Sequence, residues 1–102
     1  MRNAALLIAI VILCLPRISL AQDENERNFN KGMEYYQQGL YDKAIIELEI
    51  SKMAAPGNKR VRYNLGIAYL QLDKDQKAAE EFLYLVKAGE DTAGVRYYLG
   101  RA

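Results

Sequence analysis

The strongest constraint on the fold is a phrase that the sequence contains twice. VRYNLGIA occupies residues 61–68 and VRYYLGRA occupies residues 95–102, so the second copy begins 34 positions after the first. Six of their eight positions are identical. Self-similarity at a fixed period of this size is typical of chains built from stacked structural units. We therefore expect the fold to be built from a repeated unit whose length equals this spacing.

The same spacing relates the rest of the chain. A shift of 34 positions aligns residues 25–58 with residues 59–92, and a third copy begins at residue 93 and reaches residue 102. The aligned positions that keep their residue are Asn30/Asn64, Gly32/Gly66, Tyr35/Tyr69, Gln37/Gln71, Lys43/Lys77, Ala44/Ala78, Glu47/Glu81 and Ala54/Ala88. We take residues 25–58 as repeat one, residues 59–92 as repeat two and residues 93–102 as the start of repeat three.

Each unit has the pattern of two helices joined by a short turn. In repeat two, apolar residues recur at helical spacing over residues 61–72 and again over residues 78–86. The stretch 73–75 interrupts the pattern as a turn, Asn58 is a candidate N-cap, and Gly89 marks the end of the second helix. The sequence therefore predicts an all-α fold of stacked, antiparallel helix-turn-helix repeats.

Repeat one follows the same order. Apolar residues recur over residues 29–38 and 44–53, a turn is expected around Gly39, and Pro56 lies where the unit closes. Thr92 is the candidate N-cap of repeat three.

Small residues at matching places explain how the two helices of a unit approach each other. Gly32 and Gly66 would let the second helix of each unit lie against the first, with Ala44 and Ala78 facing them. Glycine inside a helix costs about 0.5–1 kcal/mol relative to alanine, so its repetition in register indicates a packing requirement. The residues expected to pack between helices are Gly32, Tyr35, Ala44, Leu48, Gly66, Tyr69, Ala78, Phe82 and Gly100.

The segment 1–21 has the layout of a secretory signal peptide. A basic start precedes an unbroken apolar run over residues 4–15, and Ser19 and Ala21 are small residues before the expected cleavage site. The run is shorter than the roughly 20 residues of a transmembrane helix, and an uncleaved membrane anchor is the alternative. We expect export through the Sec route and a mature domain of residues 22–102 that is periplasmic or secreted.

The expected mature domain offers little chemistry for catalysis or metal binding. The chain has no histidine, and its single cysteine, Cys14, lies in the signal peptide, so the usual bases, nucleophiles and soft ligands are missing. The signal peptide takes two of the 14 basic residues, which leaves 12 against 13 acidic residues and gives no general attraction to nucleic acid. Glu80 and Glu81 are interpreted as part of a solvated helix face. We expect no enzyme activity, no cofactor, no metal and no nucleic-acid partner.

At these positions the chain resembles the tetratricopeptide repeat family. The period matches the family, and the resemblance covers essentially all of residues 22–102. The residues that carry it are Gly32, Tyr35, Gly39, Tyr41, Ala44, Leu48 and Pro56 in repeat one, Leu65, Gly66, Tyr69, Ala78 and Phe82 in repeat two, and Leu99 and Gly100 in repeat three. The resemblance implies an α-solenoid whose first helices line a concave groove for an extended peptide or a partner's helix.

Mapped onto this chain, the groove is aromatic and aliphatic with a few polar groups. Its predicted residues are Phe29, Met33, Tyr36, Gln37, Arg60, Tyr63, Asn64, Ile67, Leu70, Gln71, Tyr97, Tyr98 and Arg101. Phe29, Tyr63 and Tyr97 recur in register, so packing between neighbouring repeats is the alternative role for these three. The family's best-known subclass clamps a terminal carboxylate with asparagine and basic side chains. Only Asn64 matches that set, so we do not expect this clamp.

The resemblance therefore implies a non-catalytic protein–protein interaction scaffold in the cell envelope. The alternative is a structural segment, the opening repeats of a larger envelope-assembly or secretion protein with no binding activity of its own. Repeat three stops at Ala102 with no second helix. We expect the chain to be a fragment of a longer repeat protein; self-association through the uncapped C-terminal helix, or a poor cap, is the alternative. An enzyme domain beyond Ala102 is the third function class.

Overall fold

The computed structural model describes residues 24–102, so the expected signal peptide and its cleavage site lie outside the described residues. Within residues 24–102 every regular element is a helix and no strand is present. An N-terminal helix covers residues 24–37, followed by α2 (Tyr41–Ala54), α3 (Lys59–Gln71), α4 (Asp75–Lys87) and α5 (Ala93–Arg101). The all-α prediction is confirmed for this part of the chain.

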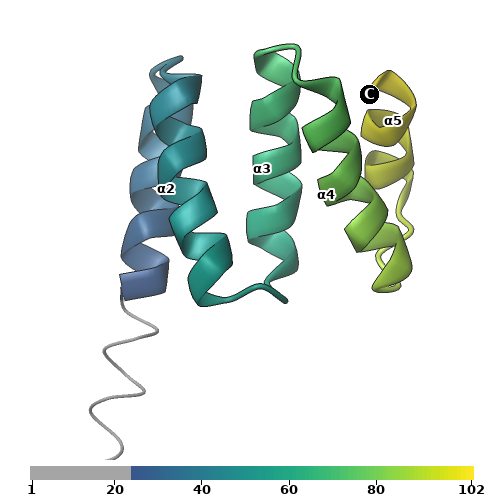
Figure 1. Ribbon diagram of the computed structural model, residues 1–102, viewed down its shortest axis with the longest axis horizontal. Coiled ribbons are helices and arrows are strands. Elements are labelled where there is room, and N and C mark those ends of the chain that lie inside the picture. The colour runs from purple at the N-terminus through teal and green to yellow at the C-terminus, as the bar shows by residue number, and fades with distance from the viewer. Residues whose placement is uncertain (1–23) are drawn as a thin grey trace, which may run out of the picture.

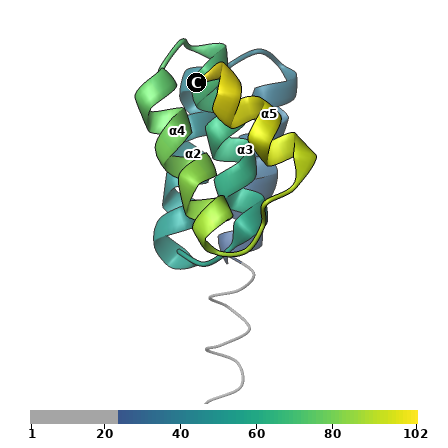
Figure 2. The same ribbon diagram turned by 90° about the vertical axis from the view of Figure 1, so that its right-hand side faces the viewer.

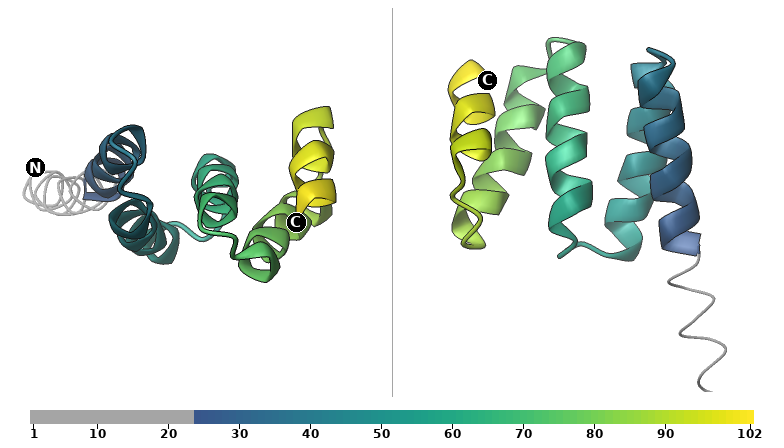
Figure 3. Two further views of the ribbon diagram at one scale, coloured as in Figure 1. Left: turned by 90° about the horizontal axis from the view of Figure 1, so that it is seen from above. Right: turned by 180° about the vertical axis from the view of Figure 1, so that it is seen from behind.

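Consecutive helices pack against one another in the order of the chain. α2 packs against α3, α3 against α4, and α4 against α5 (Figure 1). Figure 2 looks along this stack, with α4 and α5 in front of the earlier helices. Seen from above (Figure 3, left), the helices alternate between two rows. The N-terminal helix, α3 and α5 form one row, which we call the inner row, and α2 and α4 form the outer row.

The helix starts recur at the spacing of the sequence repeat. α2 begins at Tyr41 and α4 at Asp75, while α3 begins at Lys59 and α5 at Ala93, a separation of 34 positions in both pairs. Equivalent helices of successive units are therefore equally placed along the chain.

Two side chains cap the inner-row helices as predicted. Asn58 Oδ1 accepts hydrogen bonds from the backbone N–H groups of Arg60 at 3.1 Å and Val61 at 3.3 Å. Thr92 Oγ1 accepts a hydrogen bond from the N–H of Val95 at 3.3 Å. These bonds satisfy donors that have no partner within the first turn of a helix, so both predicted N-caps are confirmed.

The turns between the two helices of each unit share one backbone conformation. Gly39 has φ 76° and Asp73, 34 positions later, has φ 56°. Leu40 N–H donates to the Tyr35 carbonyl at 2.9 Å, and Lys74 N–H donates to the Tyr69 carbonyl at 2.9 Å. Both turns therefore close their helix in the same way. In the second turn an aspartate takes the left-handed conformation, which glycine adopts more easily.

Two glycines permit the close approach of the helices within a unit. A Cβ atom on Gly66 would lie 2.6 Å from Cζ of Phe82, and a Cβ atom on Gly32 would lie 2.9 Å from Cγ of Leu48. The third glycine at this register, Gly100, is exposed, and a Cβ atom there would meet no atom within 4 Å. Gly100 thus makes no packing contact of this kind among the described residues.

The core lies between the two rows. Its residues, each at most 7% exposed, are Phe29, Leu48, Val61, Leu65, Ala68, Tyr69, Ala78, Phe82, Leu85 and Val95. They come from all five helices, so the inner row is held in place by contacts along the whole stack.

Candidate functional site

All the residues predicted to bind a peptide lie on the inner row. Four lie on the N-terminal helix, six on α3 and three on α5. We call these thirteen residues the inner-row surface. The contacts described below connect them from one helix to the next.

The N-terminal helix and α3 meet at both ends of this surface. The guanidinium carbon of Arg60 lies 4.1 Å from the ring centroid of Phe29, and Arg60 Nη2 lies 3.7 Å from Glu26 Oε1. One end of the surface is thus closed by a cation–π contact and an exposed ion pair. At the other end, Gln71 Nε2 donates a hydrogen bond to the Tyr36 hydroxyl at 3.3 Å.

An aromatic cluster connects α3 to α5. The Tyr63 and Tyr98 rings meet edge to face at 5.8 Å between centroids, and Tyr98 stacks on Phe82 of α4 at 5.7 Å. Tyr97 contacts Tyr98 edge to face at 5.2 Å. These separations are those of favourable aromatic pairs, so the cluster fixes α5 on the rest of the stack.

The members of the surface differ in how far they reach solvent. Phe29 is only 7% exposed and belongs to the core. Six others are partly buried and pack against the core: Met33, Tyr36, Tyr63, Ile67, Leu70 and Tyr98. Asn64 is partly buried, and its side-chain nitrogen donates to the Arg60 carbonyl at 2.8 Å. The exposed members are Gln37, Arg60, Gln71, Tyr97 and Arg101.

On α5 an exposed aromatic ring and an exposed cationic group lie together. Tyr97 is 61% exposed, and the guanidinium carbon of Arg101 lies 5.9 Å from its ring centroid. Burial, together with the neighbouring Tyr98, raises the pKa of the Tyr63 phenol above its ordinary value of 10.0, so this hydroxyl remains a donor further into the alkaline range. The surface itself carries cations and no carboxylate, although Glu26 lies beside Arg60.

A hollow of about 250 Å³ adjoins this surface between the starts of α3 and α5. Its lining residues are Lys59, Arg60, Tyr63, Leu85, Glu90, Thr92 and Val95. The ion pair between Lys59 Nζ and Glu90 Oε1, at 3.1 Å, lies at this hollow. Because Arg60 and Tyr63 belong to both, a ligand on the inner-row surface could extend a side chain into it.

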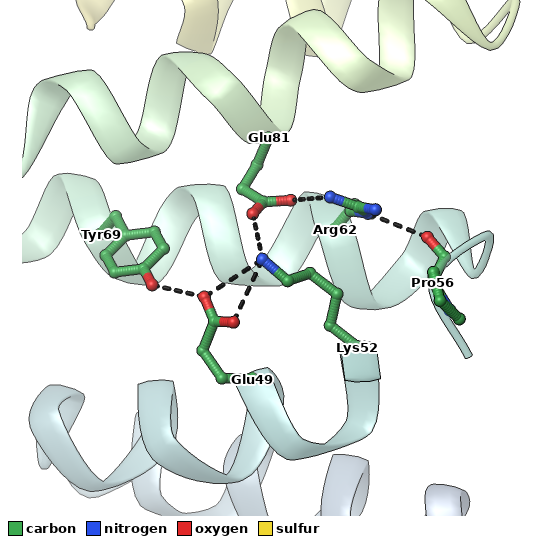
Figure 4. A network of polar contacts seen from close by, with 6 residues as sticks. All are labelled: Glu49, Lys52, Pro56, Arg62, Tyr69 and Glu81. Atoms are coloured by element: carbon green, nitrogen blue, oxygen red, sulfur yellow. Dashed lines mark hydrogen bonds and ion pairs between the residues drawn. The ribbon is translucent and has the colours of Figure 1, made fainter. Parts of the chain in front are cut away.

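A polar network behind the surface holds the two repeats together (Figure 4). Glu81 of α4 is 4% exposed, and it accepts hydrogen bonds from Lys52 Nζ of α2 at 2.8 Å and from Arg62 Nη1 of α3 at 3.1 Å. The interpretation of Glu81 as part of a solvated face is wrong. A buried carboxylate needs such partners because desolvation penalises its charge.

The network continues on both sides of Glu81. The Tyr69 hydroxyl donates to Glu49, and Lys52 Nζ also contacts Glu49 Oε2 at 3.1 Å (Figure 4). Although burial alone would lower it, the bonds to Glu81 and Glu49 raise the pKa of Lys52. Burial, followed by the carboxylate of Glu49, raises the pKa of Tyr69. The folded chain therefore favours the protonated forms of Lys52 and Tyr69.

Arg62 adds a third tie between the repeats. Its Nε donates to the Pro56 carbonyl at 3.0 Å, and its guanidinium carbon lies 3.8 Å from the ring centroid of Tyr84. This network was not predicted from the sequence. A signal for the network was present in the repeat, because Glu47 aligns with Glu81 and Arg62 aligns with Arg96 at a spacing of 34 positions.

Comparison with models of known protein families and with curated proteins finds no match for this chain. Among residues 24–102, no helix is both long enough and apolar enough to span a membrane. In the same residues, no group of three or more His, Cys, Asp or Glu side chains is placed to hold a metal ion.

Proposed function

We propose that the chain is a non-catalytic scaffold of the tetratricopeptide repeat kind, which binds an extended peptide or a partner's helix in the cell envelope. The observation that carries the proposal is the inner-row surface. Contacts between side chains connect three helices there. Arg60 of α3 contacts Phe29 of the N-terminal helix, and Tyr63 of α3 contacts Tyr98 of α5. A surface assembled from successive repeats is how repeat stacks present an extended binding site.

Three recurrences at a spacing of 34 positions support an α-solenoid of this period. The helix starts recur, the left-handed turn residues recur as Gly39 and Asp73, and the tight glycine contacts recur as Gly32 with Leu48 and Gly66 with Phe82. Independent local features that agree in register favour a true repeat over a chance match of sequence.

The exposed chemistry indicates the kind of segment that would bind. Tyr97 offers a large apolar face at low entropic cost, while Gln37 and Gln71 offer amides to a peptide backbone. Arg60 and Arg101 favour a segment that carries a carboxylate near an apolar side chain. Self-association through α5 is a variant of this proposal, because Tyr97 and Gly100 are exposed there.

The second candidate is a purely structural repeat segment of a larger envelope-assembly or secretion protein. The burial of Phe29, and the partial burial of Met33, Ile67 and Leu70 against the core, favour it. These four side chains already have a packing role, so they are not evidence of a ligand.

Affinity capture from an envelope extract distinguishes the two candidates. The bait is the chain itself, compared with a Tyr97→Ala/Arg101→Ala variant and with Leu83→Ala as a matched control on the outer row. Leu83 is 45% exposed and is not part of the inner-row surface. A scaffold should capture the same partner with the chain and with the control, and lose it with the double variant. Identical capture by all three baits would favour the structural segment.

A further inference from the structure

α5 exposes two residues whose equivalents in α3 are covered by the next helix of the stack. A Cβ atom on Gly66 of α3 would lie 2.6 Å from Cζ of Phe82, whereas a Cβ atom on Gly100 of α5 would meet no atom within 4 Å. The side chain of Arg62 is 16% exposed, and that of Arg96, in the same register, is 71% exposed. Arg96 and Gly100 are four positions apart, so they share one side of the helix. We call Arg96 and Gly100 the α5 site.

The α5 site is separate from the surface proposed above to bind a peptide. α5 is the last helix of the inner row (Figure 3), and neither Arg96 nor Gly100 belongs to the inner-row surface. Arg96 Nε donates a hydrogen bond to Asp91 Oδ1 at 2.6 Å, but both side chains are exposed. An exposed ion pair contributes little to stability, so a carboxylate that becomes buried against Arg96 can replace Asp91.

The two outer-row helices show what kind of segment covers such a site, because they share a sequence pattern. An alanine is followed three positions later by a glutamate and then by a large apolar residue, at residues 44–48 in α2 and residues 78–82 in α4. In both helices the apolar side chain lies against the glycine of the first helix of its unit, and the glutamate pairs with a cation of that helix. The ion pairs are Glu47 with Lys31 at 3.9 Å and Glu81 with Arg62 at 3.1 Å.

We propose that the α5 site binds a helix of a partner protein that carries the same pattern of alanine, glutamate and a leucine or phenylalanine. Gly100 would accept the large apolar side chain as Gly66 accepts Phe82. Arg96 would pair with the glutamate as Arg62 does within the chain. The partner's helix would thus continue the outer row, with the contacts that α3 and α4 already make and with complementary charge.

A second copy of the chain does not fit this site. Within residues 24–102 the pattern occurs in α2 and α4, and in both helices its alanine and its large apolar residue are fully buried. A second copy could offer either helix only by opening its own core. The exposed residues of the N-terminal helix are all polar or charged, so the other end of the stack offers no apolar side chain to Gly100. The site therefore favours a different protein.

A synthetic peptide with the sequence of residues 73–89 supplies this pattern in a separate molecule. Titration of the labelled peptide with the full chain, followed by fluorescence anisotropy, measures its dissociation constant. We expect reversible binding, because an isolated helix of this length is marginal in water and must be ordered on binding. Gly100→Leu should weaken binding by about tenfold or more, since its side chain would occupy the place of the peptide's phenylalanine. This loss also excludes exchange of the peptide with the chain's own α4, which Gly100→Leu does not affect.

A charge reversal tests the ion pair independently. Arg96→Glu should weaken binding of the peptide by about fivefold or more. A peptide with Glu81→Arg should bind the Arg96→Glu chain better than it binds the unaltered chain. Arg27→Glu is the matched control, an exposed arginine of the N-terminal helix, and it should bind the original peptide as the unaltered chain does. Circular dichroism should show unchanged helix content in the variants, because the altered residues are exposed.

Four results would overturn the inference. They are no binding of the peptide to the unaltered chain, equal binding by Gly100→Leu, a charge reversal that the altered peptide does not compensate, and a chain from its own cells in which a second copy or a further helix of the same chain covers Gly100. Sedimentation velocity and intact mass measure the last. None of these results depends on the inner-row surface, since the altered residues lie outside it.

Discussion

A Cβ atom on Gly66 would lie 2.6 Å from Cζ of Phe82, so the phenylalanine ring occupies the space that any larger residue at position 66 would need. One repeat earlier, Gly32 and Leu48 stand in the same relationship at 2.9 Å. These two contacts set how closely α4 approaches α3 and how closely α2 approaches the N-terminal helix. They are therefore the places where the stack is most sensitive to the size of a side chain.

We expect Gly66→Ala to destabilise the fold by about 1–3 kcal/mol, the usual cost of overpacking a core. The loss should occur although alanine is the better helix former. Urea denaturation followed by circular dichroism measures it. Gly100→Ala is the matched control, because a Cβ atom there meets nothing within 4 Å and the helix should gain up to about 1 kcal/mol. Equal effects of the two substitutions would refute the role assigned to Gly66.

The turn at Asp73 offers a stabilising substitution. Asp73 has φ 56° where the equivalent residue of repeat one is Gly39, and a non-glycine residue in this conformation costs about 1–2 kcal/mol. We expect Asp73→Gly to raise the free energy of unfolding by up to about 1 kcal/mol, because glycine also gains freedom in the unfolded chain. Gly39→Asp should lower it. Thermal melts of both variants check the two signs, and a destabilised Asp73→Gly would contradict the backbone assignment.

Because Lys52 belongs to the buried network, it should contribute more to the stability of the fold than a surface lysine does. Lys52→Met removes one of the two basic partners of Glu81, and we expect a loss of about 1–3 kcal/mol, typical of hydrogen bonds to charged groups. The control is Lys59→Met, which breaks the exposed pair with Glu90 and should cost under about 1 kcal/mol. Denaturant titration of both variants measures the difference, and equal losses would argue against a buried network.

The stability of the fold should decrease at alkaline pH. The folded pKa of Tyr69 is raised above its ordinary value of 10.0, so its contribution is fully present below about pH 10 and is lost as the pH rises further. Lys52, whose pKa is raised from 10.5, contributes in the same direction. We expect the free energy of unfolding of the chain to fall above pH 10, and to fall less steeply in Tyr69→Phe. Parallel curves for the two proteins would show that Tyr69 has no such role.

The helical fold could be read from the sequence because its signals are local. Apolar periodicity located the helices, and Asn58 and Thr92 marked two of their starts. α2 and α4 begin three residues earlier than the first apolar residues predicted, at Tyr41 and Asp75. Their first turns are largely polar and carry no apolar period, so periodicity alone could not extend the helices that far.

The candidate site was less predictable, because burial depends on residues from neighbouring repeats. Phe29 was expected on the binding surface, yet Arg60 from the next repeat covers its ring. Glu81 was expected in solvent, yet Lys52 from the preceding repeat pairs with it. The exposure of Ile46 and Ile50 on α2 was not predicted for a related reason, since both read as ordinary apolar residues until the structure shows which side of α2 faces the core.

The expected export of the chain gives a prediction that is independent of the fold. If the segment 1–21 is a cleaved signal peptide, the protein isolated from its cells should begin at Gln22. Mass spectrometry of the intact chain and N-terminal sequencing both measure this. A chain that still begins at Met1 would favour the membrane anchor instead.

The affinity of the chain for the partner that it captures tests the proposed function most directly. We expect Tyr97→Ala to weaken binding by about fivefold or more, because tyrosine is enriched among the interface residues whose loss costs over about 1 kcal/mol. Leu83→Ala should bind as the unaltered chain does. Isothermal titration calorimetry on the three proteins gives the dissociation constants. Unchanged affinity in Tyr97→Ala, or an equal loss in Leu83→Ala, would contradict binding at the inner-row surface.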